Sequence, residues 1–294
     1  MLILISDPFD DSLGAKLKEF GQVTTDKSRL GDASVVLVRS KTVCDKKYID
    51  SAKNIKVIIR GGVGVDNIDV EYAKERGILV FNTPKASAIA VAELAFALMI
   101  SVPNHLVELH NGMKEGKWLK SVKRNELYGK RLALLGLGNI GTKLAVRAQA
   151  FGMEVVAYDK YVTESDVAKL YPTAQEAVQD ADYIQIHLPL TEETECMFCD
   201  KLIDACRRSP VVINTGRGGC IDADGMLKAL NEGKISWYAT DVYPSDPPAA
   251  DYPLLKSDRV TLTPHVGGNT EENLLRIGDE IYFILKDLNN RGEL

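Results

Sequence analysis

Three glycines stand at a spacing that suits the binding of a phosphate-containing ligand. Gly136, Gly138 and Gly141 form a G-x-G-x-x-G pattern in the segment LALLGLGNIG, between an apolar run typical of a strand and a segment, 139–150, typical of a helix. The first glycine would permit a tight turn, the second would let a pyrophosphate approach the backbone, and the third would let helix and strand pack closely. Because the first N–H groups of a helix are unpaired, they can face the anion. This context predicts a dinucleotide-binding turn.

A carboxylate follows this motif at the distance that ribose binding requires. Asp159 comes eighteen positions after Gly141, at the end of the next predicted strand, VVAYD. A carboxylate there can accept hydrogen bonds from both hydroxyl groups of an adenosine ribose, and it would repel a 2′-phosphate. Although Lys160 follows it, we expect a preference for NAD over NADP. The alternative is a glycine turn in a nucleotide-free domain, with Asp159 on the surface.

Three further segments lie at predicted carboxyl ends of strands, where open α/β folds place their ligands. They are INTGRGG (213–219), ATDVYPSDPP (239–248) and LTPHVGG (262–268). With IRGGVGVDNID (59–69), FNTP (81–84), LGLGNIG and HLPLTEET (187–194), they make the chain resemble the D-isomer-specific 2-hydroxyacid dehydrogenases. Within that family the resemblance is greatest to the members that act on 3-phosphoglycerate. It covers nearly the whole chain and implies hydride transfer with NAD.

The resemblance also implies a catalytic set of Arg217, Asp246 and His265. An arginine offers several N–H donors to the carboxylate and the 2-oxygen of a keto acid. A histidine can give a proton to that oxygen during reduction and take it back during oxidation, and an acid beside it can orient the ring. The alternatives are a surface ion pair of Arg217 with Asp222 or Asp224, and a loop histidine at 265.

One member of this set departs from the family pattern. The family usually has Glu at the position of Asp246, whose side chain is shorter by about 1.5 Å, one C–C bond. Either the loop of residues 245–248 moves inward to keep contact with His265, or the pair of side chains is weakened. Of the other histidines, we expect His105 and His110 to be structural and His187 to form a wall beside the adenine.

Two arginines indicate a second anion site. Arg39 ends the predicted strand VVLVR and Arg60 ends VIIR, beside the turn 61–64. Backbone N–H groups of Gly62, Val63 and Gly64 can hold a carboxylate, while the two arginines can hold a doubly charged group such as a phosphate. The alternatives are an ion pair of Arg60 with Asp66 or Asp69, and a solvated strand end at Arg39. The family resemblance implies 3-phosphoglycerate or its keto acid as the substrate.

The residues that we expect to contact the cofactor lie in the turns at these strand ends. They are Gly136, Gly138, Asn139, Ile140, Gly141, Asp159, His187, Leu188, Pro189, Thr215, Gly216, Arg217, Asp241, His265, Gly267 and Gly268.

The elements that must position these residues alternate between short β-branched runs and helical patterns, which predicts parallel sheets. One series of strands is expected at Leu2–Ser6, Val35–Val38, Val57–Ile59 and Ile78–Phe81, with helices near 11–20, 45–53 and 69–76. A second series is expected at Arg131–Leu135, Val155–Tyr158, Tyr183–Ile186, Val211–Ile213, Trp237–Thr240 and Val260–Leu262. We therefore predict two doubly wound parallel-sheet domains around a cleft, one of the Rossmann type and one flavodoxin-like.

Helical segments mark the boundaries between these two domains. A long apolar helix is expected at 87–102, followed by a weakly helical stretch to Tyr128, and an amphipathic helix at Glu271–Leu288 has no strand after it and can return to cover the first domain. We predict a substrate domain of residues 1–86 plus 269–294 and an NAD-binding domain of residues 87–268. A length of 294 residues agrees with two domains, at about 150 residues each.

Composition narrows the class of protein. Apolar residues make up 45% and charged residues 26%, which is usual for a globular protein. A net charge of −5 argues against a general binder of nucleic acid or anionic membranes. The longest apolar stretch contains Glu93 and ends at Pro103, and the start, MLILISD, lacks the features of a signal peptide. We expect no membrane span and a cytoplasmic location.

The five cysteines are few and odd in number. Cys196, Cys199 and Cys206 have the spacing of one helix stripe, so we expect core packing. The alternatives are a redox pair or half of a zinc site, but no second C-x-x-C or H-x-x-x-H accompanies the first, and we predict no metal.

The family resemblance implies an NAD-dependent dehydrogenase that oxidises D-3-phosphoglycerate, the first step of serine biosynthesis, or reduces its keto acid. The alternatives are a reductase for glyoxylate, hydroxypyruvate or another unphosphorylated acid, and an NADH-sensing binding protein similar to the co-repressors of the family. The helix at 87–102 and the stretch after it are longer than one domain needs, so we expect a homodimer through the cofactor domain. The chain ends soon after the last helix, and we expect no regulatory domain.

Overall fold

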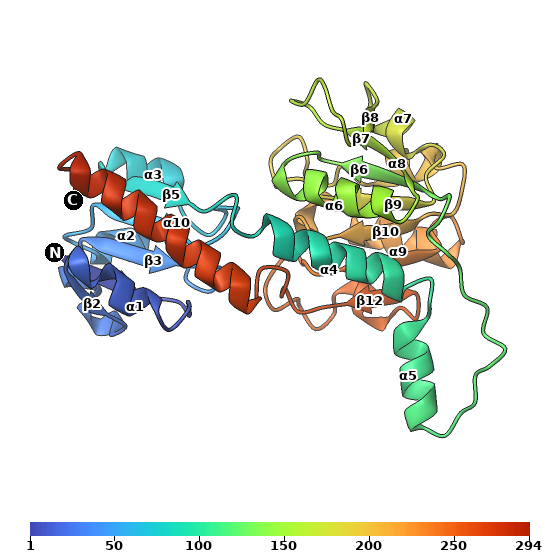
Figure 1. Ribbon diagram of the computed structural model, residues 1–294, viewed down its shortest axis with the longest axis horizontal. Coiled ribbons are helices and arrows are strands. Elements are labelled where there is room, and N and C mark those ends of the chain that lie inside the picture. Colours follow the sequence, from blue (N-terminus) through green and yellow to red (C-terminus); the bar gives the residue numbers. More distant parts are fainter. The chain divides into compact units, whose positions relative to one another are not determined.

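A computed structural model describes residues 1–294, which divide into two compact units (Figure 1). The first unit comprises Met1–Ala88 and Gly268–Leu294, and the second comprises Ile89–Gly267. The boundaries predicted from the sequence fall within one or two residues of these. Every pair of neighbouring strands is parallel in both sheets, which confirms the predicted fold class of two parallel α/β domains.

The first unit contains a five-stranded sheet in the order β2-β1-β3-β4-β5. Its strands are β1 (Leu2–Ile5), β2 (Gln22–Thr24), β3 (Val35–Val38), β4 (Val57–Arg60) and β5 (Leu79–Asn82). The sequence did not predict β2, because this edge strand has only three residues and none of them is buried. The register pairs Val38 with Arg60, so the residues after β3 and at the end of β4 share one edge of the sheet.

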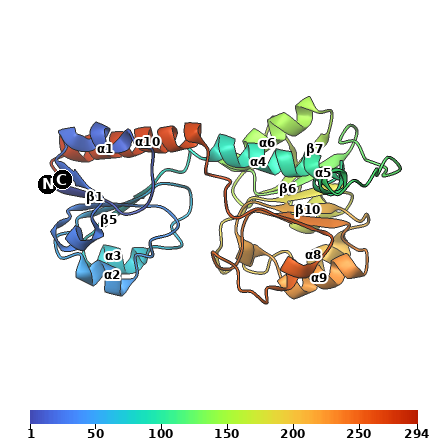
Figure 2. The ribbon, with the colours of Figure 1, turned by 90° about the horizontal axis from the view of Figure 1, so that it is seen from below.

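Helices cover both faces of this sheet (Figure 2). On one face lie α1 (Leu13–Lys16), the 3₁₀ turn η1 (Leu17–Glu19) and the terminal helix α10 (Glu271–Asn290), and on the other lie α2 (Lys46–Ser51) and α3 (Val70–Glu75). A second 3₁₀ segment, η2, spans Lys27–Asp32.

Alternating residues of the strands supply the two cores of this unit. Val35 and Leu37 pack on the side of α10, and Val36 and Val38 pack on the side of α2 and α3. Helix α10 buries Ile277, Ile281, Leu285 and Leu288 in the first of these cores. The prediction that the last helix returns to the first domain is confirmed.

The second unit contains a seven-stranded sheet in the order β12-β11-β10-β9-β6-β7-β8. Its strands are β6 (Arg131–Leu135), β7 (Glu154–Tyr158), β8 (Lys169–Leu170), β9 (Tyr183–Ile186), β10 (Val211–Asn214), β11 (Trp237–Thr240) and β12 (Val260–Leu262). The chain runs outward from β6 to β8, then returns to β9 and continues in the other direction. The switch point where parallel sheets bind ligands therefore lies between β6 and β9.

Helices α4 (Ala88–Ser101) and α6 (Asn139–Ala150) lie on one face of this sheet, and α7 (Ala174–Val178), α8 (Asp200–Ala205) and α9 (Ala223–Asn231) lie on the other (Figure 2). Two 3₁₀ segments, η3 (Gly218–Cys220) and η4 (Pro253–Lys256), complete the unit. Helix α5 (Leu106–Lys114) and the segment after it extend away from the body of the unit (Figure 1). No single helix has the length and apolarity to cross a membrane; α4 and α5 reach that measure only together, across a bend of 65°.

The prediction of one helix stripe for three cysteines is wrong. Helix α8 begins at Asp200 and ends at Ala205, so Cys199 and Cys206 flank it as caps. Cys196 is exposed in the preceding turn, where its φ is 48°. The helical spacing is present in the sequence, but the short helix does not extend over it. Only Cys206 keeps the expected packing role: it packs against the core of this unit, and burial raises its pKa to about 12.

Candidate active site

The glycine turn after β6 has the geometry that its spacing predicts. Gly136 has φ of 99°, and a Cβ there would lie 2.8 Å from His187 O. A Cβ on Gly141 would lie 2.4 Å from Gly136 O, so this glycine lets α6 pack against the turn. Gly138 is the N-cap of α6, and a Cβ there would meet nothing within 4 Å. Open space at Gly138 and a helix N-terminus fit the pyrophosphate of NAD.

Asp159 holds the glycine turn in place. Its carboxylate accepts hydrogen bonds from Leu137 N–H at 2.7 Å, Tyr161 N–H at 2.8 Å and Val162 N–H at 3.1 Å. The carboxylate still has lone pairs for ribose hydroxyls, because two oxygens offer about four acceptor positions. Lys160 donates to both oxygens of Glu193, at 2.7 and 2.5 Å, and this neighbour raises the pKa of Lys160. Lys160 is thus already neutralised, in agreement with a preference for NAD.

His187 is held neutral beside the glycine turn. Its Nδ1 lies 3.2 Å from Thr215 Oγ1, its Nε2 is buried without a hydrogen-bond partner, and burial lowers its pKa to about 3. A group with this pKa is uncharged near neutral pH and does not carry protons there. A wall beside the adenine stays a prediction for His187. His105 caps α5 and contacts Glu108, and His110 lies on α5.

Arg217 follows β10 in a turn that needs its glycines. The buried side chain of Asn214 accepts from Gly216 N–H at 3.0 Å and donates to Arg217 O at 2.9 Å. A Cβ on Gly216 would lie 2.9 Å from Leu188 O, and one on Gly218 would lie 2.1 Å from the backbone of Tyr243. The loops of Leu188 and Tyr243 therefore lie close to the backbone on both sides of Arg217 and fix its position. The side chain of Arg217 is half-buried.

The loop that carries His265 is held by Asp241, which follows β11. Asp241 is buried, and its carboxylate accepts from Thr263 Oγ1 at 2.6 Å, Val266 N–H at 2.9 Å and Gly267 N–H at 2.7 Å. These bonds bracket His265, whose φ of 53° is uncommon for a residue with a side chain. In the structure, both carboxylate oxygens of Asp241 accept hydrogen bonds from the loop that carries His265. The expected contact of Asp241 with the cofactor stays a prediction.

His265 and Asp246 are brought together. His265 Nδ1 lies against Asp246 Oδ2, and the two side chains are 34% and 41% exposed. Asp246 therefore keeps its contact with His265, although its side chain is shorter than the Glu that is usual in the family. The imidazole Nε2 is on the opposite side of the ring from this pair. A histidine held by an acid through one nitrogen, and open to solvent, has the arrangement of a general acid and base.

In the first unit, Arg60 lies over the glycine turn. A Cβ on Gly62, whose φ is 149°, would lie 1.6 Å from Arg60 Nη1, so only glycine admits the guanidinium at this place. The carbonyl groups of the turn are occupied, because Gly62 O accepts from Thr83 N–H at 3.0 Å and Val63 O accepts from Asn82 Nδ2. Asp69, an alternative partner for Arg60, is the N-cap of α3.

Arg39 lies at the same edge of this sheet, after β3. Its guanidinium makes long contacts with Pro8 O at 3.3 Å and Gly268 O at 3.4 Å. Burial lowers its pKa, although the nearby Asp7 acts in the opposite direction. The alternative of a solvated strand end is wrong, since the side chain is partly buried against these carbonyl groups.

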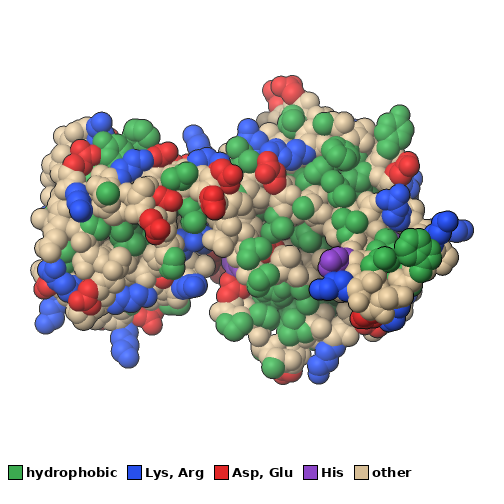
Figure 3. All heavy atoms as spheres, turned by 60° about the horizontal axis from the view of Figure 1, so that its bottom comes forward, with side chains coloured by type: hydrophobic (Ala, Val, Ile, Leu, Met, Phe, Trp, Pro, Cys, Tyr) green, Lys and Arg blue, Asp and Glu red, His purple; other side chains and the backbone are tan.

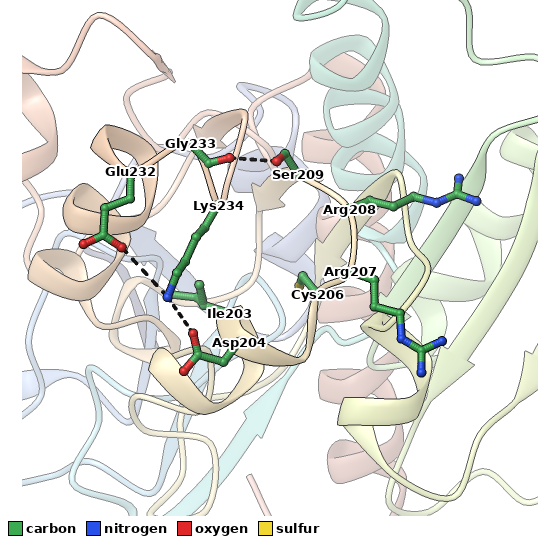
Figure 4. Close-up of a pocket in the computed structure, with 9 residues that line it drawn as sticks. All are labelled: Ile203, Asp204, Cys206, Arg207, Arg208, Ser209, Glu232, Gly233 and Lys234. Atoms are coloured by element: carbon green, nitrogen blue, oxygen red, sulfur yellow. Dashed lines mark hydrogen bonds and ion pairs between the residues drawn. The ribbon is translucent and has the colours of Figure 1, made fainter.

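Figure 4 shows a surface pocket of the second unit. It is lined by the segments that precede β10 and β11, at the amino edge of the sheet. Lys234 contacts Asp204 at 2.7 Å and Glu232 at 3.8 Å there, and Ser209 donates to Gly233 O at 2.7 Å. None of the predicted site residues lines it.

Sequence reasoning missed the residues that hold the site. Asn214 and Thr263 were not predicted, although Asn214 directly precedes the predicted Thr215 and Thr263 lies two positions before the predicted His265. The signal that could have found Asn214 is its place at the end of a buried strand, where a polar side chain must find partners.

Comparison with known proteins identifies the family. The sequence profile of the D-isomer specific 2-hydroxyacid dehydrogenase, NAD binding domain, matches residues 96–267. The chain is 40% identical over 305 aligned positions to D-3-phosphoglycerate dehydrogenase of Methanocaldococcus jannaschii, covering 99% of this chain and 58% of that protein. It is 39% identical to hydroxypyruvate reductase of Thermotoga maritima, covering 94% of each. The chain thus spans little more than half of the first relative and nearly all of the second.

Solved structures agree with this assignment. The NAD-dependent formate dehydrogenase of Staphylococcus aureus, determined in complex with NAD, superposes with a TM-score of 0.87 at 27% identity, covering 99% of this chain and 96% of that one. The glycine turn, the carboxylate at Asp159 and the profile match concern the same unit of the chain. The protein belongs to the D-isomer specific 2-hydroxyacid dehydrogenases, and its second unit is the NAD-binding domain of that family.

Proposed function

We propose that the protein oxidises D-3-phosphoglycerate to 3-phosphohydroxypyruvate with NAD, or catalyses the reverse reduction, as the first step of serine biosynthesis. The observation that carries the substrate is the pair of arginines, Arg39 and Arg60, at one edge of the first sheet beside Gly62. Two guanidinium groups suit a phosphate, because a phosphate carries more negative charge than a carboxylate and has more oxygen atoms that accept hydrogen bonds. The relative from Methanocaldococcus jannaschii carries the name of this activity.

The residues of the second unit would perform the chemical step. The glycine turn and Asp159 would hold NAD, which would supply the acceptor for the hydride from C2 of the hydroxy acid. Arg217 donates hydrogen bonds to the substrate carboxylate and the 2-oxygen and so fixes the face that C2 presents. His265 accepts the hydroxyl proton through Nε2 during oxidation and returns it during reduction, while Asp246 orients the ring through Nδ1. The backbone N–H groups of residues 62–64 are assigned to the carboxylate.

A second candidate is a reductase for unphosphorylated keto acids such as hydroxypyruvate or glyoxylate. It is favoured by the relative from Thermotoga maritima, a hydroxypyruvate reductase that the chain matches over 94% of both lengths. Contacts of Arg39 with two carbonyl groups favour it as well, because they give that arginine a structural role. An NADH-sensing binding protein is the third alternative; it would bind NADH without turning over any keto acid.

The test is NADH consumption by the purified protein with 3-phosphohydroxypyruvate, compared with hydroxypyruvate, glyoxylate and pyruvate at equal concentrations. We expect a clear preference for the phosphorylated acid. Preference for an unphosphorylated acid would replace the first candidate by the second. Absence of turnover with all four acids, together with NADH binding, would favour the binding protein.

We also propose that two copies of the chain associate through the cofactor domain. Four apolar residues of α5 and the segment after it are at least half exposed: Leu106 (50%), Val107 (57%), Met113 (54%) and Trp118 (75%). Apolar side chains are visible on the surface of this unit (Figure 3). An exposed apolar segment of this kind is typical of a protein interface. Sedimentation should give a dimer, and Trp118→Ser should shift it toward the monomer.

The cytoplasmic location stays a prediction.

A further inference from the structure

Two polar side chains from separate parts of the first unit hold the turn that carries Arg39. Asp7, which follows β1, is only 4% exposed; its carboxylate accepts from Arg39 N–H at 2.6 Å, Thr42 N–H at 3.1 Å and Thr42 Oγ1 at 2.7 Å. Asn67 donates its side-chain amide to Arg39 O at 2.7 Å and to Thr42 O at 2.6 Å. At both ends of the turn, residues 39 and 42, Asp7 therefore binds the backbone N–H group and Asn67 binds the backbone carbonyl group.

Backbone hydrogen bonds of Cys44 also connect this turn to the loop that begins with the glycine turn beside Arg60. Cys44 N–H donates to Asn67 O at 2.7 Å, Asp69 N–H donates to Cys44 O at 3.0 Å, and Cys44 and Ile68 form a parallel bridge. Asn67 thus contacts the arginine turn through its side chain and, by way of Cys44, through its backbone. Because Asn67 lies in the loop that begins with residues 61–64, it sets the spacing between the two turns.

The backbone, more than the guanidinium, determines where Arg39 lies. The two contacts of its guanidinium, at 3.3 and 3.4 Å, are longer than a usual N–H···O bond of about 2.9–3.0 Å. The bonds to its N–H and its carbonyl group, at 2.6 and 2.7 Å, are short. A guanidinium binds phosphate through a planar fork, so a displaced backbone would misplace the fork. A misplacement of about 1 Å is enough to weaken such binding strongly.

We propose that Asp7 and Asn67 are positioning residues that fix Arg39 beside the glycine turn, and that they thereby determine how well the enzyme distinguishes a phosphorylated keto acid from an unphosphorylated one. The inference rests on the proposed function, because it assigns the phosphate to Arg39 and Arg60. Neither Asp7 nor Asn67 needs to touch the substrate. Their effect should therefore fall on KM for the phosphorylated acid and leave the chemical step unchanged.

The test compares Asn67→Ala with Asn54→Ala. Asn54 makes the same kind of bond, from its amide to Gly31 O at 2.9 Å, but at the amino edge of the same sheet. KM and kcat are measured with 3-phosphohydroxypyruvate and with hydroxypyruvate at saturating NADH. We expect Asn67→Ala to raise KM for the phosphorylated acid about tenfold, the equivalent of one lost charge-assisted hydrogen bond. KM for hydroxypyruvate and both kcat values should stay close to wild type, and Asn54→Ala should change none of the four.

A second variant covers the case in which Asn67→Ala does not fold. Asp7→Asn keeps the shape of the side chain but offers one acceptor oxygen to three donors, so it should raise the same KM. Equal changes with both acids, or no change with either, would overturn the inference and leave only a structural role. A wild-type enzyme without preference for the phosphorylated acid would overturn the proposed function, and this inference with it. A preference that both variants leave intact would overturn this inference alone.

Discussion

The carboxyl edges of the two sheets are built on the same plan but present different groups. In each, a buried acid after one strand binds the backbone of the loop after a neighbouring strand: Asp7 holds the turn 39–42, and Asp241 holds the loop 263–267. The loop in the second unit presents His265, an exposed side chain paired with an acid. The turn in the first unit presents Arg39, a partly buried cation.

Under the proposed function, this difference would separate the chemical step from the selection of the substrate. A proton carrier must be reachable and able to change its charge, whereas a group that recognises an anion must keep its charge and its position. Substitutions at the edge of the second unit should therefore change kcat with every substrate. Substitutions at the edge of the first unit should change KM with the phosphorylated substrate.

The largest expected effect is that of His265→Gln. Removal of a general acid and base usually costs about 10²- to 10⁴-fold in rate, so we expect kcat to fall on the order of 10³-fold with 3-phosphohydroxypyruvate and hydroxypyruvate alike. Steady-state assays measure this, and fluorescence titration should show that NADH still binds. His110→Gln, on the surface of α5, is the matched control. A variant that retains a tenth of the wild-type rate would place the proton carrier elsewhere.

Asp246→Ala tests the partner of this histidine. Because Asp246 contacts Nδ1 of His265, its loss should lower kcat on the order of tenfold and change the pH–rate profile. Asp246→Glu should restore part of the rate. If the profile of Asp246→Ala matched that of the wild type, Asp246 would have no part in the mechanism.

A smaller effect is expected at the cofactor turn. Glu193→Gln releases Lys160 from an exposed ion pair, and the free cation can then attract a 2′-phosphate. Since exposed pairs contribute about 0–1 kcal/mol, we expect kcat/KM with NADPH to rise no more than about fivefold, with little change for NADH. Asp204→Asn breaks a similar exposed pair, with Lys234, at the opposite edge of the sheet and should have no effect. An unchanged ratio in both variants would leave cofactor choice to Asp159.

The smallest effect concerns stability and pH. Burial lowers the pKa of His187 from 6.5 to about 3, so between these values the unfolded chain binds a proton that the folded chain does not. The folded state is therefore destabilised progressively as the pH falls from 6.5 toward 3. His187→Gln should make the decrease in Tm over this interval less steep, whereas His110→Gln should leave it unchanged. An identical slope in His187→Gln would show that His187 is protonated in the folded protein.

The strands were predictable because buried β-branched runs define them. Segments 35–38, 131–135, 183–186, 237–240 and 260–262 form strands at the predicted bounds. The helical stretch expected to continue to Tyr128 ends instead at Lys114, since Gly116 adopts φ of 76° and Lys117 N–H returns to Gly112 O at 2.8 Å.

The candidate site was predictable to a different degree in the two units. In the second unit, the covalent structure of a dinucleotide dictates the glycine spacing, so the motif can be recognised from the sequence. In the first unit, the arginines could be found but not the residues that hold them. Asp7 and Arg39 are distant in the sequence, and only the folded sheet brings them together. The same holds for Asp241 and the histidine loop.

Under the proposed function, the first unit selects a phosphorylated acid through Arg39 and Arg60. The most direct measurement is the ratio of kcat/KM for 3-phosphohydroxypyruvate to that for hydroxypyruvate, in the wild type and in Arg60→Ala, because the two acids differ only by the phosphate. We expect a ratio well above one in the wild type and a decrease of at least about tenfold in Arg60→Ala, through KM. A ratio that is the same in both proteins would contradict it.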